Sequence, residues 1–308
     1  MDTQILPFER KLYAIEAELN RADTEEERYA LGIRRDRELA LAYARISPWQ
    51  RVQLARHPMR PRMLDYTCRI FDDFIELHGD RVSGEDPAMI CGIARFQGRS
   101  LLVAGQQKGI GFEEQQARNF GMAHPSGYRK ALRIFRLAEK LRLPIMTLVD
   151  TPAAHPGIEA EQTGQGFAIA QNLRAMAGLK TPVFSVVLSE GGSGGAIGIA
   201  VADWVAMFQY AVYMICPPER CAEILWRDVN KKALAAAALK VTADDLLALG
   251  VVDRVLPETC GAAHHDPAAA AKALSRELEW FLGEYDKGTW TLERRRERIR
   301  RWGLPGEA

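Results

Sequence analysis

Two segments that follow apolar, strand-like stretches hold the residues whose types could do chemistry. Residues 150–157 read Asp-Thr-Pro-Ala-Ala-His-Pro-Gly, and residues 190–196 read Glu-Gly-Gly-Ser-Gly-Gly-Ala. Glycines remove side chains from a turn, so main-chain N–H groups at a helix N-terminus can approach a ligand and stabilise negative charge. The second segment therefore predicts an anion or oxyanion site.

The type of anion depends on which motifs are missing from the second segment. The sequence there lacks the G-x-x-x-x-G-K-[ST] pattern, and Ile197 stands where a dinucleotide fingerprint needs its last glycine. Close packing of a helix on a strand is an alternative reason for the glycines. The segment also satisfies G-x-S-x-G around Ser193, with Asp253 and His264 later in the order that hydrolases use. A serine hydrolase is therefore a further hypothesis.

Histidine and cysteine spacing gives no support for a metal site. The six histidines show no liganding spacing, so we expect no metal in this chain. His155 lies in the first segment, either as a base or as an ordinary loop histidine. The cysteines are odd in number, scattered and without a C-x-x-C pair, which favours a reducing compartment and a cytoplasmic location. They are Cys68, Cys91, Cys216, Cys221 and Cys260.

Charge and hydropathy exclude two classes of partner. The chain of 308 residues has 41 Lys and Arg against 40 Asp and Glu, a net charge of +1. Nucleic-acid binding usually needs a basic field, so we expect no nucleic-acid partner. The basic run Arg294–Arg301 is interpreted as a solvated helix with Glu293 and Glu297 as local partners. The charged first residues and the short apolar run at 191–202 predict neither a signal peptide nor a membrane span.

The elements that must position the two segments alternate in type. Residues 8–46 predict one or two helices with a break at 22–24, and Pro58 and Pro61 predict a linker. We expect strands at 88–96, 100–104, 144–149, 182–188, 204–208, 212–215 and 251–256, and helices at 127–141, 161–177, 194–202, 218–226 and 242–249. Such alternation predicts an α/β fold with a mostly parallel, doubly covered sheet, in which ligands bind beyond the carboxyl ends of strands.

Several separated motifs together resemble one known family. They are Leu54-Ala-Arg-His-Pro58, Gln107-Lys-Gly109, Asn119-Phe-Gly-Met122, Gly127-Tyr-Arg-Lys-Ala-Leu132, Asp150-Thr-Pro152, Glu190-Gly-Gly-Ser-Gly-Gly-Ala196 and Cys221-Ala-Glu-Ile-Leu-Trp226. In this order they resemble the alpha subunits of bacterial acetyl-CoA carboxylase carboxyltransferase, from about Trp49 to the C-terminus. The resemblance implies a crotonase-like (ClpP/crotonase) fold in residues 49–308, preceded by a helical N-terminal segment in residues 1–48.

The same resemblance implies a function and a set of partners. The subunit would transfer a carboxyl group from carboxybiotin on a separate biotin carboxyl carrier protein to acetyl-CoA or a related acyl-CoA, giving malonyl-CoA. Its active site would be shared with a zinc-ribbon beta subunit, and biotin carboxylase would be a further partner. The chain would be inert alone. A non-catalytic scaffold that has kept the fold is an alternative.

The resemblance also assigns candidate site residues. Gly194 and Gly195 match the glycine pair that would stabilise the biotin ureido oxygen. The residues expected to contact biotin or substrate are Gly192, Ser193, Ala196, Ala153, Ala154, His155 and Lys108. Arg129 and Lys130 are further candidate contacts for anions, with salt bridges as the alternative. Departures from the family pattern include Ala153 for glycine, His155 for tyrosine, Gly166-Phe167 for Ser-Glu, Arg220 for glycine and an acidic 112–116 segment.

Overall fold

The computed structural model describes residues 5–258 and 261–302. Its helices are η1 (Pro7–Glu9), α1 (Arg10–Leu19), α2 (Glu25–Tyr43), α3 (Pro48–Ala55), α4 (Met63–Ile70), α5 (Gly111–Ala117), η2 (Asn119–Gly121), α6 (Pro125–Leu141), α7 (Ile158–Gln162), α8 (Gln165–Gly178), α9 (Ser193–Ile197), α10 (Pro218–Trp226), η3 (Val229–Lys231), α11 (Lys232–Ala238), α12 (Ala243–Ala248), α13 (Pro267–Asp286) and α14 (Leu292–Arg301). Within the described ranges, no helix combines the length and apolarity that crossing a membrane requires.

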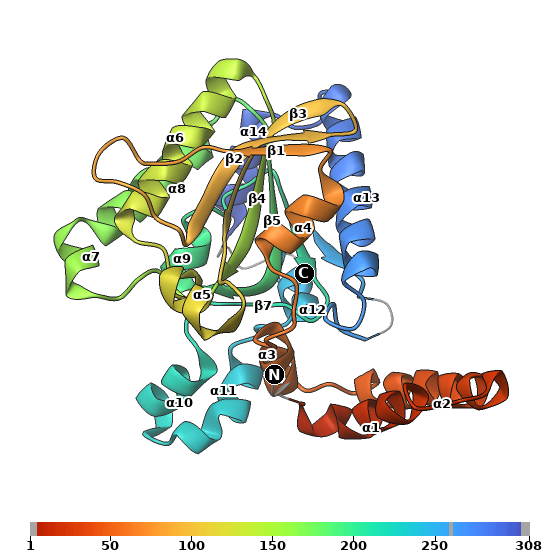
Figure 1. Ribbon diagram of the computed structural model, residues 1–308. Coiled ribbons are helices and arrows are strands. Elements are labelled where there is room, and N and C mark those ends of the chain that lie inside the picture. The colour runs from red at the N-terminus through yellow and green to blue at the C-terminus, as the bar shows by residue number, and fades with distance from the viewer. Residues whose placement is uncertain (1–4, 259–260, 303–308) are drawn as a thin grey trace.

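One sheet organises the body of the molecule (Figure 1). Its strands are β1 (Asp73–Glu76), β2 (Met89–Phe96), β3 (Arg99–Gln106), β4 (Ile145–Thr151), β5 (Val183–Gly192), β6 (Trp204–Phe208), β7 (Val212–Met214) and β8 (Arg254–Leu256). The order is β1-β2-β3-β4-β5-β6-β8, and β7 pairs with the end of β5. The pairs from β3 to β8 are parallel, whereas β1, β2 and β3 are antiparallel. The predicted mostly parallel sheet is confirmed.

Local turn chemistry explains the hairpin between β2 and β3. Gln97 and Gly98 have φ values of 48° and 78°. Positive φ at both central residues is the requirement of a type I′ turn, whose twist matches that of the flanking strands. The predicted pairing across Gln97 and Gly98 is therefore confirmed.

Helices cover both faces of the sheet, as the strand–helix alternation predicted. Helices α6 and α8 pack on one face, and α4 and α13 pack on the other (Figure 1). Helix α6 buries a stripe at helical spacing that contains Tyr128, Ala131, Phe135 and Ala138. Because both faces are covered, β4 and β5 are buried along their whole length.

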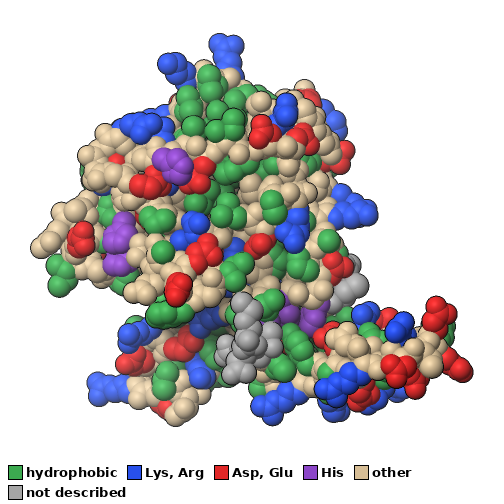
Figure 2. Space-filling view, viewed as in Figure 1, with side chains coloured by type: hydrophobic (Ala, Val, Ile, Leu, Met, Phe, Trp, Pro, Cys, Tyr) green, Lys and Arg blue, Asp and Glu red, His purple; other side chains and the backbone are tan. Residues whose placement is uncertain are grey.

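The N-terminal helices form a hairpin that projects from the body (Figure 1). The predicted break at residues 22–24 is confirmed, because α1 ends at Leu19 and α2 begins after Thr24. Thr24 caps α2 and exchanges hydrogen bonds with Glu27 in a capping box. Figure 2 shows both acidic and basic side chains along the hairpin. The boundary of the helical segment at residue 48 remains a prediction.

The structure contradicts two expectations about the elements of the chain. The segment around Pro58 and Pro61 is not a linker, because Arg60 is buried and its guanidinium bonds to buried Glu258. The helix expected at 194–202 is shorter, since α9 ends at Ile197.

The basic C-terminal helix is not simply solvated. Arg295 in α14 is buried and donates hydrogen bonds to Asp203 and to the carbonyl groups of Met176, Leu179 and Thr181. The hydrophobic period and the composition of the helix could not show that Arg295 is buried, because the hydrogen-bond acceptors of Arg295 come from other elements of the fold.

Candidate active site

The glycine-rich turn between β5 and α9 lies at the carboxyl end of the parallel strands. Every residue of β5 is buried, and α9 starts at Ser193, whose φ of 49° lies in the left-handed region. Backbone strain of this kind costs on the order of 1–3 kcal/mol and clusters at functional sites. The abrupt change from strand to helix leaves the first N–H groups of α9 without helical acceptors.

Close packing on the first candidate segment explains Gly192 and Gly195 but not Gly194. A Cβ atom on Gly192 would overlap the backbone of Pro152 and Ala153, and one on Gly195 would lie 2.5 Å from Ala154 N. The two candidate segments therefore pack directly on each other. Gly194 differs, because the atom nearest to its Cβ position is Ile169 Cδ1 at 3.5 Å, an ordinary contact distance.

Two buried side chains fix the orientation of the turn. The Gly195 carbonyl accepts hydrogen bonds from Gln106 Nε2 at 2.9 Å and from the Tyr128 hydroxyl at 3.2 Å. Gln106 also accepts a hydrogen bond from Asp150 N at 3.1 Å, so it links the ends of β3 and β4 to α9. Burial raises the pKa of Tyr128, so its hydroxyl stays protonated and available as a donor.

An apolar pocket of about 410 Å³ adjoins the turn. It is lined by Ser193, Gly194, Ile197, Tyr213, Met214, Ile215, Leu246 and Val251. Gly194 is half-buried at this pocket, whereas Gly195 is buried. The Gly194 carbonyl accepts the Gly198 N–H at 3.1 Å. Because N–H and C=O point in opposite directions across a trans peptide, this bond aims the Gly195 N–H away from the helix.

The first candidate segment supports the turn from the other side. Thr151 Oγ1 donates to the Ala153 carbonyl at 2.6 Å, and the backbone of Ala153 does not adopt a positive φ, so its methyl group is accommodated. The ring of His155 stacks on that of His124 with 4.0 Å between centroids. Burial and the neighbouring His124 imidazole lower the pKa of His155. Gln165 Nε2 donates to the His155 carbonyl at 3.0 Å and holds the loop.

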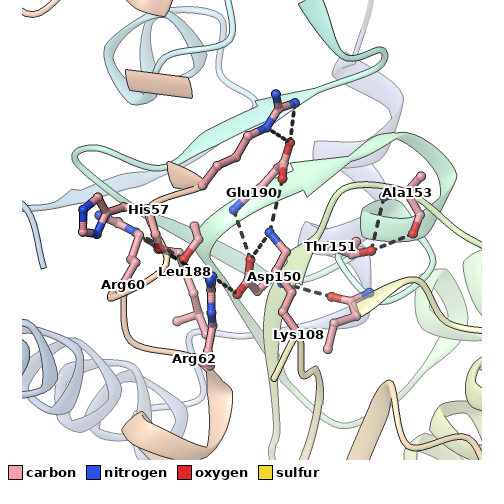
Figure 3. Close-up of polar contacts among 12 residues, drawn as sticks. His57, Arg60, Arg62, Lys108, Asp150, Thr151, Ala153, Leu188 and Glu190 are labelled. Carbon is pink, nitrogen blue, oxygen red and sulfur yellow. Dashed lines mark hydrogen bonds and ion pairs between the residues drawn. The ribbon is translucent and has the colours of Figure 1, made fainter. Parts of the chain in front are cut away.

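Lys108 lies in a buried network of charges near the carboxyl ends of β4 and β5 (Figure 3). Its Nζ is 2.8 Å from Asp150 Oδ1 and 3.2 Å from Glu190 Oε2. Arg62 pairs with Asp150 at 3.3 Å, and Arg56 pairs with Glu190 at 2.8 Å. Burial alone would raise the pKa of Glu190, but the Lys108 ammonium and the Arg56 guanidinium lower it overall. The Lys108 ammonium is therefore neutralised by protein carboxylates.

Sequence reasoning missed the partners in this network and the role of Gln106. Gln106, Asp150 and Glu190 all lie near the carboxyl ends of β3, β4 and β5, which are neighbours in the sheet. The rule that placed the ligand site at this edge could also have grouped these side chains.

The remaining predicted residues have structural partners. Arg129 pairs with Asp80 at 2.8 Å, and Lys130 is fully buried and pairs with Glu85. Ala196 is buried in the core, so its side chain does not reach the pocket. Arg220 is exposed and pairs with Glu223 at 2.6 Å, so the extra charge is balanced within its own helix.

The serine hydrolase hypothesis is wrong, because the carboxylate and the imidazole of its triad have other partners. Ser193 is exposed at the apolar pocket. The Asp253 carboxylate accepts hydrogen bonds from Val205 N at 2.7 Å and from Arg298. His264 Nε2 lies 3.2 Å from Glu9 Oε1. The carboxylate and the imidazole that a triad would need are therefore engaged elsewhere.

The doubly covered, mostly parallel sheet defines a crotonase-like fold. Transcarboxylase 12S has this fold with a TM-score of 0.58 and 22% identity, over 71% of this chain and 41% of that chain. A Pseudomonas malonate decarboxylase hetero-tetramer in complex with coenzyme A contains a chain with a TM-score of 0.53 and 19% identity, matched over 71% of this chain and 91% of that one. This chain spans less than half of the transcarboxylase chain.

Sequence comparison then identifies the family. Residues 1–303 match the family model described as acetyl co-enzyme A carboxylase carboxyltransferase-like, and the chain belongs to this family. It is 46% identical to the acetyl-coenzyme A carboxylase carboxyl transferase subunit alpha of Cyanothece sp., over 97% of this chain and 96% of that protein. The subunit of the same name from Aromatoleum aromaticum is 45% identical over 98% of both chains.

Proposed function

We propose that this chain is the alpha subunit of a biotin-dependent acetyl-CoA carboxyltransferase. It would complete its active site with a zinc-ribbon beta subunit and receive carboxybiotin on a carrier protein that biotin carboxylase loads. Transfer of the carboxyl group to acetyl-CoA would give malonyl-CoA. Family membership over nearly the whole length supports this function, and the relatives of similar length carry the corresponding name.

The observation that carries the proposed chemistry is the position of Gly194 at the apolar pocket. This pocket would hold the biotin ring, and the bound cofactor would supply the carboxyl group from its ureido group, whose oxygen would carry negative charge. The N–H groups of Gly194 and Gly195 would stabilise that charge, since α9 leaves its first donors without helical acceptors. The apolar walls of the pocket suit a ring system that is apolar apart from its ureido group. Walls of low polarity would also strengthen these hydrogen bonds by excluding water.

The other residues of the site would act by positioning. Gln106 and Tyr128 donate hydrogen bonds to the Gly195 carbonyl, and the backbone of residues 152–154 packs against the turn. Such contacts fix the donors before the reaction, so little reorganisation is needed as charge develops. Ser193, Ala153, Ala154 and His155 would shape the entrance, and Lys108 would support it through its ion pairs.

The substitution Gly194→Ala tests this role. The new methyl group meets only Ile169 Cδ1 at 3.5 Å, so the fold should be kept, while the group narrows the pocket beside the amide. We expect kcat for malonyl-CoA-dependent carboxylation of free biotin, measured with the partner subunit, to fall by about 10²-fold, the scale of losing one oxyanion donor. Gly283→Ala in α13 is the control, because nothing lies within 4 Å of its Cβ position.

Three outcomes separate the hypotheses. Wild-type turnover in an assembled Gly194→Ala complex would contradict the oxyanion role. An assembled complex of the unmodified chain that transfers no carboxyl group would favour a scaffold. Labelling of Ser193 by a fluorophosphonate probe in the chain alone would contradict the conclusion that Asp253 and His264 form no triad with it.

A further inference from the structure

Segments that are far apart in the sequence meet where the N-terminal hairpin joins the body. Glu9 is fully buried, and its Oε1 lies 3.2 Å from His264 Nε2 and 3.0 Å from His265 Nε2. The Tyr43 hydroxyl donates a hydrogen bond to the same oxygen. The ring of His57 stacks on that of His264 with 4.0 Å between centroids. Figure 2 shows histidine surface at the junction between the hairpin and the body.

Three residues at this junction lie close enough together to hold one metal ion. Glu9, His57 and His264 can each offer one ligand atom, and these atoms all lie within 4.8 Å of one another. Two further atoms, Glu9 Oε2 and His264 Nδ1, are buried and have no hydrogen-bond partner among the described residues. Buried polar atoms in folded proteins nearly always have a partner. The cluster therefore has acceptor capacity that the described residues do not use.

We propose that this cluster binds one zinc ion, or a divalent transition metal of similar chemistry, which ties the hairpin to the body. Imidazole nitrogen and carboxylate oxygen are ordinary zinc ligands, with bonds of about 2.0–2.1 Å. In a tetrahedral site such bonds separate the ligand atoms by about 3.3 Å. The separation of 3.2 Å from Glu9 Oε1 to His264 Nε2 is close to this value, and the ligand atoms of Glu9, His57 and His264 all lie within 4.8 Å of one another.

The donor set also discriminates between metals. Magnesium and calcium take about six to eight oxygen ligands, which a single carboxylate among imidazoles cannot supply. Zinc binds neutral imidazole and carboxylate, so its binding would displace the protons that lie between Glu9 and the histidines. His265, or a water molecule, would complete the coordination around Glu9, His57 and His264.

The position of the cluster assigns the ion a structural role. Glu9 precedes α1, His57 follows α3, and His264 lies between β8 and α13. An ion held by all three residues stabilises only the state in which these segments meet, so its binding free energy adds to folding. The pocket at Gly194 is lined by other residues.

The test uses the full chain purified alone, without a metal-affinity tag, so that metal carried by a partner is not counted. After treatment with a chelator, the chain is titrated with zinc against a chromophoric competitor, and the metal content is measured by mass spectrometry. We expect about one zinc per chain and a Tm increase of about 5 °C at a hundredfold excess over the Kd. Cobalt should give the visible absorption of a tetrahedral site, whereas magnesium should leave the Tm unchanged.

Matched variants locate the ion. Glu9→Gln and His264→Gln should each weaken zinc binding by about 10²-fold or more. Loss of a residue that only hydrogen-bonds to a ligand costs about 10- to 100-fold in metal affinity, and loss of a ligand itself should cost at least as much. His78→Gln should bind zinc like the wild type, although it alters the exposed cluster of Glu76, His78 and Glu85. Wild-type affinity in both folded variants would overturn the proposal. If the variants do not fold, a wild-type chain that takes up no zinc and shows no Tm increase would overturn it.

Discussion

The two donors on the Gly195 carbonyl provide a quantitative test of how the turn is held. Gln106 and Tyr128 are both fully buried, and each donates to this one oxygen. Tyr128→Phe removes one donor and leaves the other, so we expect a loss of about 1 kcal/mol in the free energy of unfolding. Gln106→Leu removes the other donor and also leaves the buried Asp150 N–H without its acceptor. Its expected cost is about 2–4 kcal/mol.

The double variant of Gln106→Leu and Tyr128→Phe tests whether the two donors are coupled through the Gly195 carbonyl. In each single variant the Gly195 carbonyl keeps one donor, whereas in the double variant this buried oxygen keeps neither. The cost of the double variant should therefore exceed the sum of the single costs by about 1–2 kcal/mol, the penalty for an unsatisfied buried acceptor. Urea unfolding with linear extrapolation gives the three values. The turnover number of the double variant should fall by more than the loss of folded protein accounts for, because the glycine-rich turn is displaced in the molecules that remain folded.

A distant pair serves as the control. Thr181 donates to the Leu143 carbonyl at 2.5 Å, and this contact involves neither Gln106 nor the Gly195 carbonyl. Thr181→Val combined with Tyr128→Phe should be additive. If Gln106→Leu and Tyr128→Phe were also additive within about 0.5 kcal/mol, the shared carbonyl would not be the coupling element and the reasoning would be refuted.

Two further predictions concern buried charges and stability. The pKa of Glu190 is lowered in the folded chain, so its stabilising contribution is present above the unfolded pKa of about 4.3 and is lost as pH falls from there through the folded pKa. Urea unfolding at a series of pH values should show a shallower acid loss for Glu190→Gln, and equal slopes would contradict this. Arg295→Met leaves buried Asp203 without its guanidinium and should cost about 3–5 kcal/mol, whereas exposed Arg296→Met should change the unfolding free energy by less than about 0.5 kcal/mol.

Much of the fold was predictable because it depends on local patterns. Three local signals each act within a few residues. They are the apolar runs that form β4 and β5, the glycines between elements, and the pair Gln97-Gly98. The errors at α9 and at Pro58 have a common cause. Apolar residues after Ile197 continue the composition of a helix, and prolines are typical of linkers, but tertiary packing decides whether a segment ends or is buried.

The candidate site was predictable in its main chain and less so in its side chains. The segments at 150–157 and 190–196 meet, as the rule for carboxyl ends of parallel strands predicts. The ion pairs of Lys108 were not predicted, because its partners Asp150 and Glu190 come from two other strands. The roles of Gly194 and Gly195 in the reaction remain predictions for the assays above.

The amino-acid sequence by itself determined the α/β alternation, the glycine turn and the family. The reason is that hydrophobic periodicity, the backbone freedom of glycine and the order of motifs are local properties of the sequence. Only the tertiary structure decided which charged and titratable side chains meet. Spacing in the sequence gave no sign of a metal site, yet folding brings Glu9, His57 and His264 within 4.8 Å of one another. The physical reason is that ligand geometry depends on distances in space, and packing of distant segments sets those distances.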